Sequence, residues 1–154
     1  MAERLKRWVI FLALFFAAMA LGPALAHLFA LPNKVELPEA QYFVAQSVYR
    51  GWALLGIVVF GALLSTLALS IVLRDERRPM MWAVLAFLCI AGTQAIFWTW
   101  TYPSNAATDN WTTVPRNWEA LRSQWEYSHA ASAFLNIAAM VALILSVLSR
   151  KRTD

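Results

Sequence analysis

The chain has 154 residues, of which 60% are hydrophobic and only 14% are charged. A water-soluble domain carries roughly 25% charged residues, so the composition excludes an ordinary soluble fold and favours an integral membrane protein. The net charge of +4 does not indicate nucleic-acid binding, because the cations flank apolar runs and do not form a basic stripe.

The first predicted element is a membrane-spanning helix over residues 8–31, close to the ~20 apolar residues that crossing a bilayer requires. His27, one of only two histidines, lies near its far end. A second interpretation stays open. Ala24-Leu25-Ala26 resembles the cleavage site of a secretory signal, and cleavage after Ala26 would leave His27 as an N-terminal residue able to chelate copper.

A loop over residues 32–45 is followed by a second predicted span at 46–73, with Arg50 near its start. Gly51, Gly56 and Gly61 recur every five residues along this span. Small residues let helices approach closely in lipid, so they indicate tight packing. The packing could lie within one bundle, between copies of a homo-oligomer, or against a partner membrane subunit.

The third predicted span covers residues 80–100 and is interrupted by few polar side chains, among them Gln94. Trp98 falls near its end, where aromatic residues commonly mark the membrane interface. The single cysteine, Cys89, lies inside this span and is expected to be a small core residue. A loop over residues 101–125 follows, and it contains Asn105.

An amphipathic helix is predicted to begin near Pro115 and to continue into the fourth span, at 126–149, because proline suits a first helical turn. Trp118 and Trp125 lie seven residues apart on one face and are expected to pack on the bundle or the interface. Arg122 is spaced to pair with acidic residues three positions before it and four positions after it, Glu119 and Glu126.

Basic residues occur before the first span, between the second and third, and after the fourth. With four spans these clusters all lie on one side, and the positive-inside rule makes that side cytoplasmic. The prediction is a single all-α domain over residues 1–154: a four-helix bundle surrounded by the lipids of the plasma (bacterial inner) membrane, with both termini cytoplasmic. The clusters are Arg4, Lys6 and Arg7; Arg74, Arg77 and Arg78; and Arg150, Lys151 and Arg152.

Both histidines are predicted at the same depth. At ~1.5 Å per residue, His27 lies ~28 Å from Trp8, and His129 lies ~32 Å from Arg150. Gln94 and Asn136 lie ~10 Å deeper by the same rise. Polar groups within spans usually face the bundle interior, so we expect a polar pocket in the outer half.

Several ligands suit such a pocket. His27, His129 and Glu126 could hold a transition metal, and two histidines could hold haem. A di-iron site would also need Glu36 or Glu39. Either histidine could instead act as the acid or base for an organic substrate. The alternative is purely structural, with histidines bonded to loop carbonyls and Arg50 paired with Glu126 or a lipid phosphate.

Four segments resemble landmarks of the anthrone-oxygenase-like family of small four-helix membrane proteins: Gly22–His27, Tyr49–Trp52, Pro103–Asn105 and Trp118–His129. The resemblance covers nearly the whole chain and implies oxygenation of an activated aromatic. The chain departs from the family pattern after His129: a basic residue is expected a few positions on, but Ala130, Ala131, Ser132 and Ala133 follow. By position, the family's outer site would be lined by Asn105, Trp118, Arg122, Trp125, Glu126 and His129.

Two functions therefore remain. In the first, the protein is an oxidoreductase that takes a lipophilic aromatic or quinone-like molecule from the bilayer. His129 or His27 would remove a proton, Arg50 would stabilise the oxyanion, and O2 would attack the carbanion. In the second, the protein is a non-catalytic membrane subunit or a haem- or metal-binding bundle. A transporter is disfavoured, because no inverted repeat or pair of broken helices is evident.

Overall fold

The structure is a computed structural model that describes residues 2–150. It is all-helical, and no β-strand occurs in the described range. Four helices are long and apolar enough to cross a membrane, which agrees with the prediction of four spans. They are built on α1 (Ala2–Lys34), α3 (Leu55–Val72), α4 (Arg77–Ile96) and α6 (Trp118–Leu148).

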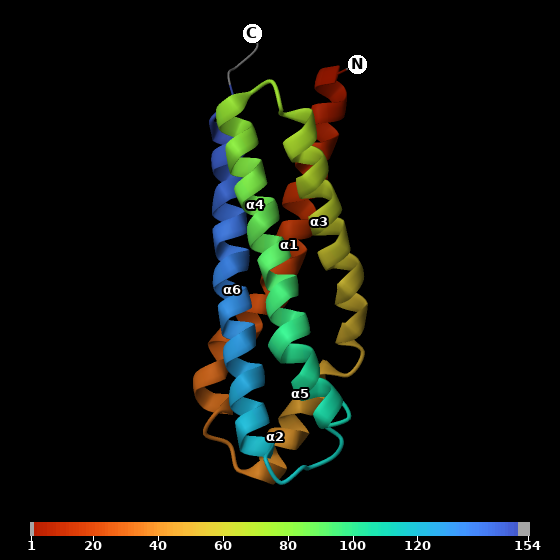
Figure 1. The fold of residues 1–154 in the computed structure, drawn as a ribbon, viewed down its shortest axis with the longest axis vertical. Helices are drawn as coiled ribbons and strands as arrows, with labels where there is room; N and C mark the ends of the chain where they lie inside the picture. Colours follow the sequence, from red (N-terminus) through yellow and green to blue (C-terminus); the bar gives the residue numbers. More distant parts are fainter. Residues whose placement is uncertain (1, 151–154) are drawn as a thin grey trace.

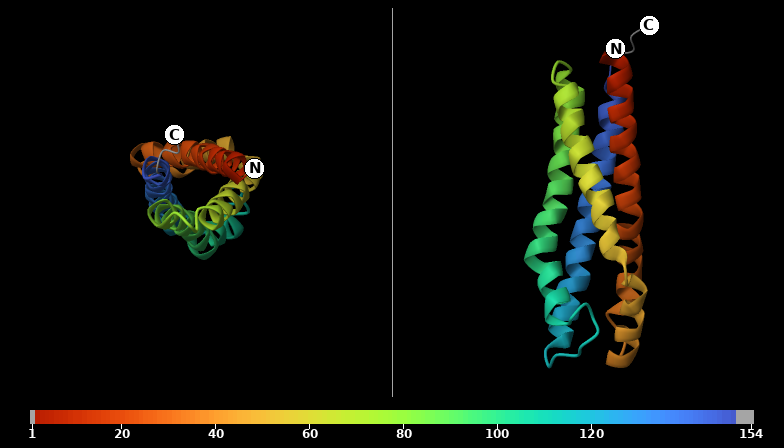
Figure 2. Two further views of the ribbon diagram at one scale, coloured as in Figure 1. Left: turned by 90° about the horizontal axis from the view of Figure 1, so that it is seen from above. Right: turned by 90° about the vertical axis from the view of Figure 1, so that its right-hand side faces the viewer.

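The long helices run up and down and form a ring (Figures 1 and 2). Contacts join α1 to α3, α3 to α4, α4 to α6 and α6 back to α1. Consecutive long helices are therefore neighbours, although only the α3–α4 connection is short. The start of α1 and the end of α6 lie beside the α3–α4 turn, at what we call the termini end, and the shorter helices lie at the opposite loop end (Figure 1).

The termini end is held by ion pairs between three parts of the chain. Glu76, in the α3–α4 turn, accepts hydrogen bonds from Lys6 at 2.8 Å and Arg150 at 3.2 Å. Glu3 pairs with the same two cations, at 3.2 and 3.0 Å. The three predicted basic clusters thus meet at one end of the bundle, apart from Lys151 and Arg152, which lie outside the described residues.

The core between the helices is built mainly from small side chains, and many of the larger apolar ones point outward. Gly61 shows how close the helices come, because a Cβ atom built there would lie 2.6 Å from the ring of Phe16 on α1. Small residues permit this approach. The fully buried alanines are Ala13, Ala62, Ala83, Ala86 and Ala133.

The loop end is more helical than predicted. Most of α2 (Glu39–Gln46) falls in the predicted loop 32–45, and the predicted loop 101–125 contains α5 (Tyr102–Ala107) and the start of α6. The second span begins later than residue 46, because Ser47–Tyr49 (η1) and Trp52–Leu54 (η2) form 3₁₀ turns. Gly51 separates them with a φ of 88°, a left-handed conformation that glycine adopts without steric cost.

The third span contains a π-helical turn that the sequence did not predict. Residues Phe97–Thr101 form this turn, η3, between α4 and α5. The carbonyl of Trp100 accepts hydrogen bonds from Gln124 at 2.8 Å and Ser104 at 3.1 Å. Such turns often occur at functional sites. On the next helix, α6 is unbroken from Trp118, so the amphipathic segment leads directly into the last span, as predicted.

Candidate functional site

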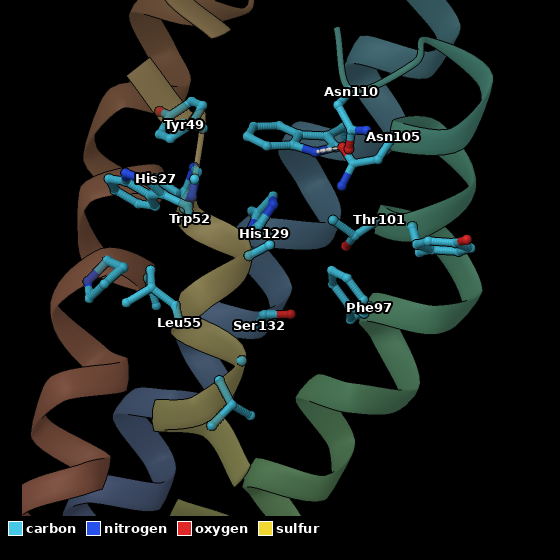
Figure 3. Close-up of a pocket in the computed structure, with 18 of the residues that line it drawn as sticks. His27, Tyr49, Trp52, Leu55, Phe97, Thr101, Asn105, Asn110, His129 and Ser132 are labelled. Carbon is cyan, nitrogen blue, oxygen red and sulfur yellow. Dashed lines mark hydrogen bonds between the residues drawn. The ribbon is translucent and has the colours of Figure 1, made fainter. Parts of the chain in front are cut away.

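A cavity of about 1150 Å³ lies near the loop end of the bundle. Its walls come from α1, the 3₁₀ turns, α3, the α4–η3–α5 arm and α6, and its lining is mostly apolar. In Figure 3, His27, Tyr49, Trp52 and Leu55 lie on one side, and Phe97, Thr101 and Asn105 lie opposite. The cavity therefore occupies the region between two walls that are far apart in sequence.

The two histidines meet at this cavity. The imidazoles of His27 and His129 are stacked, with centroids 4.0 Å apart and an interplanar angle of 19°. Trp125 packs against both, 5.0 Å from His27 and 4.2 Å from His129. Tyr49 lies 4.5 Å from His27 on another side. Aromatic rings thus fix the position of the imidazole pair.

One imidazole nitrogen has no partner. His27 is only 6% exposed, and no described residue forms a hydrogen bond with its Nδ1 atom. Burying a polar atom without a partner is unfavourable. His27 lines the cavity with the rest of its ring, so a bound molecule would reach Nδ1 only after the imidazole turns.

Eight of the predicted site residues line this cavity together. They include both histidines, from α1 and α6, and the two amide side chains that were predicted to lie deeper. Glu126, Arg122 and Trp118 do not line it, because their side chains contact Lys34, Leu37 and Tyr42 instead. The lining set is His27, Arg50, Gln94, Trp98, Asn105, Trp125, His129 and Asn136.

A buried polar cluster of Lys34, Tyr42, Gln46 and Glu126 lies beside Trp125, and Gln46 also lines the cavity. Lys34 Nζ lies 2.6 Å from Glu126 Oε1. Tyr42 donates to the same oxygen at 3.0 Å, and Gln46 donates to the Tyr42 hydroxyl at 2.6 Å. The Lys34 ammonium also lies 4.5 Å from the centre of the Trp125 ring. The cluster therefore supports the ring that packs on both histidines.

The predicted ion pairs between arginines and carboxylates are wrong. Arg50 is exposed at the rim of the cavity and does not pair with Glu126, which is bound by Lys34 instead. Arg122 forms no ion pair with Glu119 or Glu126 among the described residues. Its guanidinium donates to the Leu37 carbonyl at 2.8 Å and lies 4.7 Å from the centre of the Trp118 ring.

Sequence reasoning missed Lys34 and Tyr42 because residues 32–45 were predicted to be a loop, and it missed Gln46 and Tyr49 although both fall at the start of the predicted second span. Two signals were present. Lys34 follows His27 by seven residues, which places both on one helical face if the first helix continues. Tyr42 and Gln46 have the four-residue spacing of neighbours on a helix, which is how they lie on α2.

Burial and negative charge keep both tyrosines protonated. Loss of solvent around the Tyr49 phenol, followed by the charge of Glu126, raises its pKa to about 12. The same two causes raise the pKa of Tyr42 far above its ordinary value. Tyr42 therefore remains a hydrogen-bond donor to Glu126 at physiological pH.

Asn105 closes the loop end of the cavity. Its Oδ1 atom accepts hydrogen bonds from the indoles of Trp125 at 2.7 Å and Trp111 at 3.0 Å. The segment that carries Trp111 is strained, because Asp109, Asn110 and Trp111 have φ values of 47°, 53° and 64°. Such values are unfavourable for residues other than glycine, above all for a tryptophan. Asn105 helps to hold this loop over the cavity.

The residues do not fit the predicted metal site. The Glu126 carboxylate faces the buried polar cluster, and the ring of Trp125 packs on the imidazoles. Within residues 2–150, no three His, Cys, Asp or Glu side chains come together as metal ligands would. A bis-histidine haem does not fit either. Each imidazole would have to direct a nitrogen at the iron from about 2 Å, and two face-to-face rings cannot do so from opposite sides.

Comparison with known proteins gives no relative for this chain. No protein-family model, no curated protein and no solved structure matches it. The resemblance to anthrone-oxygenase-like proteins stays a prediction, and the function has to be argued from the site.

Proposed function

We propose that this chain is an integral membrane protein that binds a lipophilic aromatic molecule in the cavity beside His27 and His129. The observation that carries the proposal is the stacked imidazole pair beside a large, mostly apolar cavity. The imidazoles of His27 and His129 and the amide groups of Gln94 and Asn136 in the lining support a polar group on the ligand. Ligand cavities commonly combine an apolar lining with a few such polar groups.

The arrangement of charge supports an orientation in the membrane. The cations near the N-terminus, the α3–α4 turn and Arg150 gather at the termini end, and short basic flanks favour the cytoplasm. In this orientation both termini are cytoplasmic and the cavity lies in the outer half of the membrane. A lipophilic ligand would then reach the imidazoles from the bilayer or from the outer surface.

The reaction that suits this ligand is oxygenation of an activated aromatic such as an anthrone. An imidazole takes a proton from the acidic CH2 group, and Arg50 at the rim stabilises the enolate oxygen. The carbanion gives its electron pair to O2, forming a carbon–oxygen bond, and the resulting peroxide takes back the proton. Loss of water, which removes the second hydrogen of that carbon, leaves the quinone carbonyl. A histidine base contributes about 10²–10⁴-fold to such a step.

Anthrone oxidation by the protein in lipid nanodiscs tests this function. Quinone formation should depend on protein and on O2, and it should fall about 10²-fold or more in His129→Phe or His27→Phe. Glu119→Gln is the matched control, because Glu119 is exposed on α6 outside the cavity. Saturable anthrone binding without oxidation would support ligand binding and contradict the oxygenase reaction. No saturable binding would overturn both parts.

A further inference from the structure

We infer that the cavity opens sideways between α3 and α4, and that its occupant is a membrane-resident amphiphile whose tail passes through this opening. The inference rests on the proposed function, because it assumes that the ring of the ligand lies beside the imidazole pair. It adds the route of entry and a specific requirement for an apolar tail. The lateral opening is lined by Gly56, Phe60, Phe97 and Trp98.

Two residues that line the cavity are also exposed on the outer surface of the bundle. Phe60 on α3 is 63% exposed and Trp98 on the neighbouring arm is 61% exposed, although both line the cavity. α3 and α4 lie side by side near their connecting turn, and they diverge toward the loop end in the right-hand view of Figure 2. Large apolar side chains at this edge suit the acyl region of a bilayer.

Polarity changes along the cavity wall. Polar and charged residues line its rim at the loop end, among them Arg50, Asp109 and Asn110. The imidazole pair lies next, and residues such as Val59 and Phe60 line the part farther along α3. An amphiphile fits this gradient, with its polar ring toward the loop end and its tail toward the lateral opening.

The cavity is large enough for a ligand that carries a tail in addition to its aromatic ring. Drug-sized pockets usually measure about 300–1,000 Å³. A volume of about 1150 Å³ therefore leaves space beside a small aromatic head. An apolar tail that continues into the surrounding acyl chains would fill that space without burying polar groups.

Gly56 keeps the α3 wall open. A Cβ atom built at Gly56 meets no heavy atom within 4 Å, and the residue lines the cavity. A larger side chain can therefore be placed there without displacing the backbone, and it would occupy the path of the tail. Gly22 also has no heavy atom within 4 Å of a built Cβ, but it does not line the cavity, so it provides a matched control.

The test compares two probes, para-cresol and para-decylphenol, in nanodiscs, with affinities expressed per concentration in the lipid. Gly56→Phe should weaken binding of para-decylphenol about tenfold or more, as overpacking an apolar site does, and change para-cresol binding by less than about threefold. Val59→Phe narrows the same wall at a second position, in case Gly56→Phe does not fold. Gly22→Phe should leave both affinities unchanged.

The outcomes separate this inference from the proposed function. A selective loss of the tailed probe in either cavity variant supports the lateral opening. Equal losses for the two probes, or no loss for either one, overturn it while phenol binding by the wild-type protein still stands. If the wild-type protein binds neither probe, the proposed function fails and the lateral opening fails with it.

Discussion

Lys34 and Glu126 form an ion pair at the loop end, with Nζ and Oε1 2.6 Å apart and both side chains almost fully buried. The pair joins the end of α1 to α6 and lies beside α2. It also places the ammonium over the ring of Trp125, which packs on His27 and His129. The geometry of the imidazole pair therefore depends on two charges that do not themselves line the cavity.

Removing either Lys34 or Glu126 alone should lower the free energy of unfolding more than removing both charges together. Lys34→Met or Glu126→Leu leaves an uncompensated buried charge, which costs about 3–5 kcal/mol in the free energy of unfolding. The double variant should recover most of that loss, because no charge is left unpaired. Unfolding in mixed detergent micelles measures all three, with Glu119→Gln as the exposed control. Additive losses in the double variant would contradict a coupled pair.

Asn105→Ala should loosen the loop that closes the cavity. The substitution removes the acceptor shared by the indoles of Trp111 and Trp125, so we expect a loss of about 1–3 kcal/mol. Hydrogen exchange should rise most in residues 108–113, where the left-handed conformations relax once the anchor is gone. Asn117→Ala is the control, because the side chain of Asn117 makes no capping hydrogen bond. Unchanged exchange would show that the loop holds its conformation without Asn105.

Alkaline pH should destabilise the fold. In the unfolded chain tyrosines ionise near pH 10, whereas the pKa of Tyr49 is raised to about 12 in the folded protein. Between these values the folded state binds more protons, so its stability is complete below pH 10 and falls as pH rises toward 12. Unfolding experiments across this range should show a weaker pH dependence for Tyr49→Phe than for the wild type. An identical dependence would contradict this role for Tyr49.

Gly61→Ala should weaken the contact between α1 and α3. The new methyl group would lie 2.6 Å from the Phe16 ring, which must move, and overpacking of this kind costs about 1–3 kcal/mol. Adding Phe16→Leu should restore part of the loss by making space. Gly22→Ala should be neutral or stabilising by up to about 1 kcal/mol, because it only removes a helical glycine. Equal changes in stability for Gly61→Ala and Gly22→Ala would contradict a close approach of α1 and α3 at Gly61.

The sequence predicted the four long helices and the meeting of His27 with His129. Both follow from properties that add along the chain, namely hydropathy and the rise per residue. The grouping of Gln94 and Asn136 in the same cavity followed from the same reasoning. The boundaries of the second span were less predictable, because the 3₁₀ turns around Gly51 depend on how this segment packs.

The partners of the charged residues could not be predicted. Glu126 has a cation four positions before it in sequence, Arg122, yet it pairs with Lys34 from another helix. That choice depends on α1 extending to Lys34 and on α2 folding beside α6. The π-helical turn at Phe97–Thr101 is a similar case, since nothing in its sequence distinguishes it from continuous α-helix.

Photo-crosslinking tests the central claim most directly. A diazirine-bearing lipophilic phenol, bound to the protein in nanodiscs and activated by light, should label cavity residues in competition with unlabelled para-decylphenol. The expected sites lie within Leu55–Phe60, Thr93–Trp98 and His129–Asn136. Labelling confined to outward-facing residues such as Leu64 and Leu88, or labelling that the competitor does not reduce, would contradict a ligand site beside the two histidines.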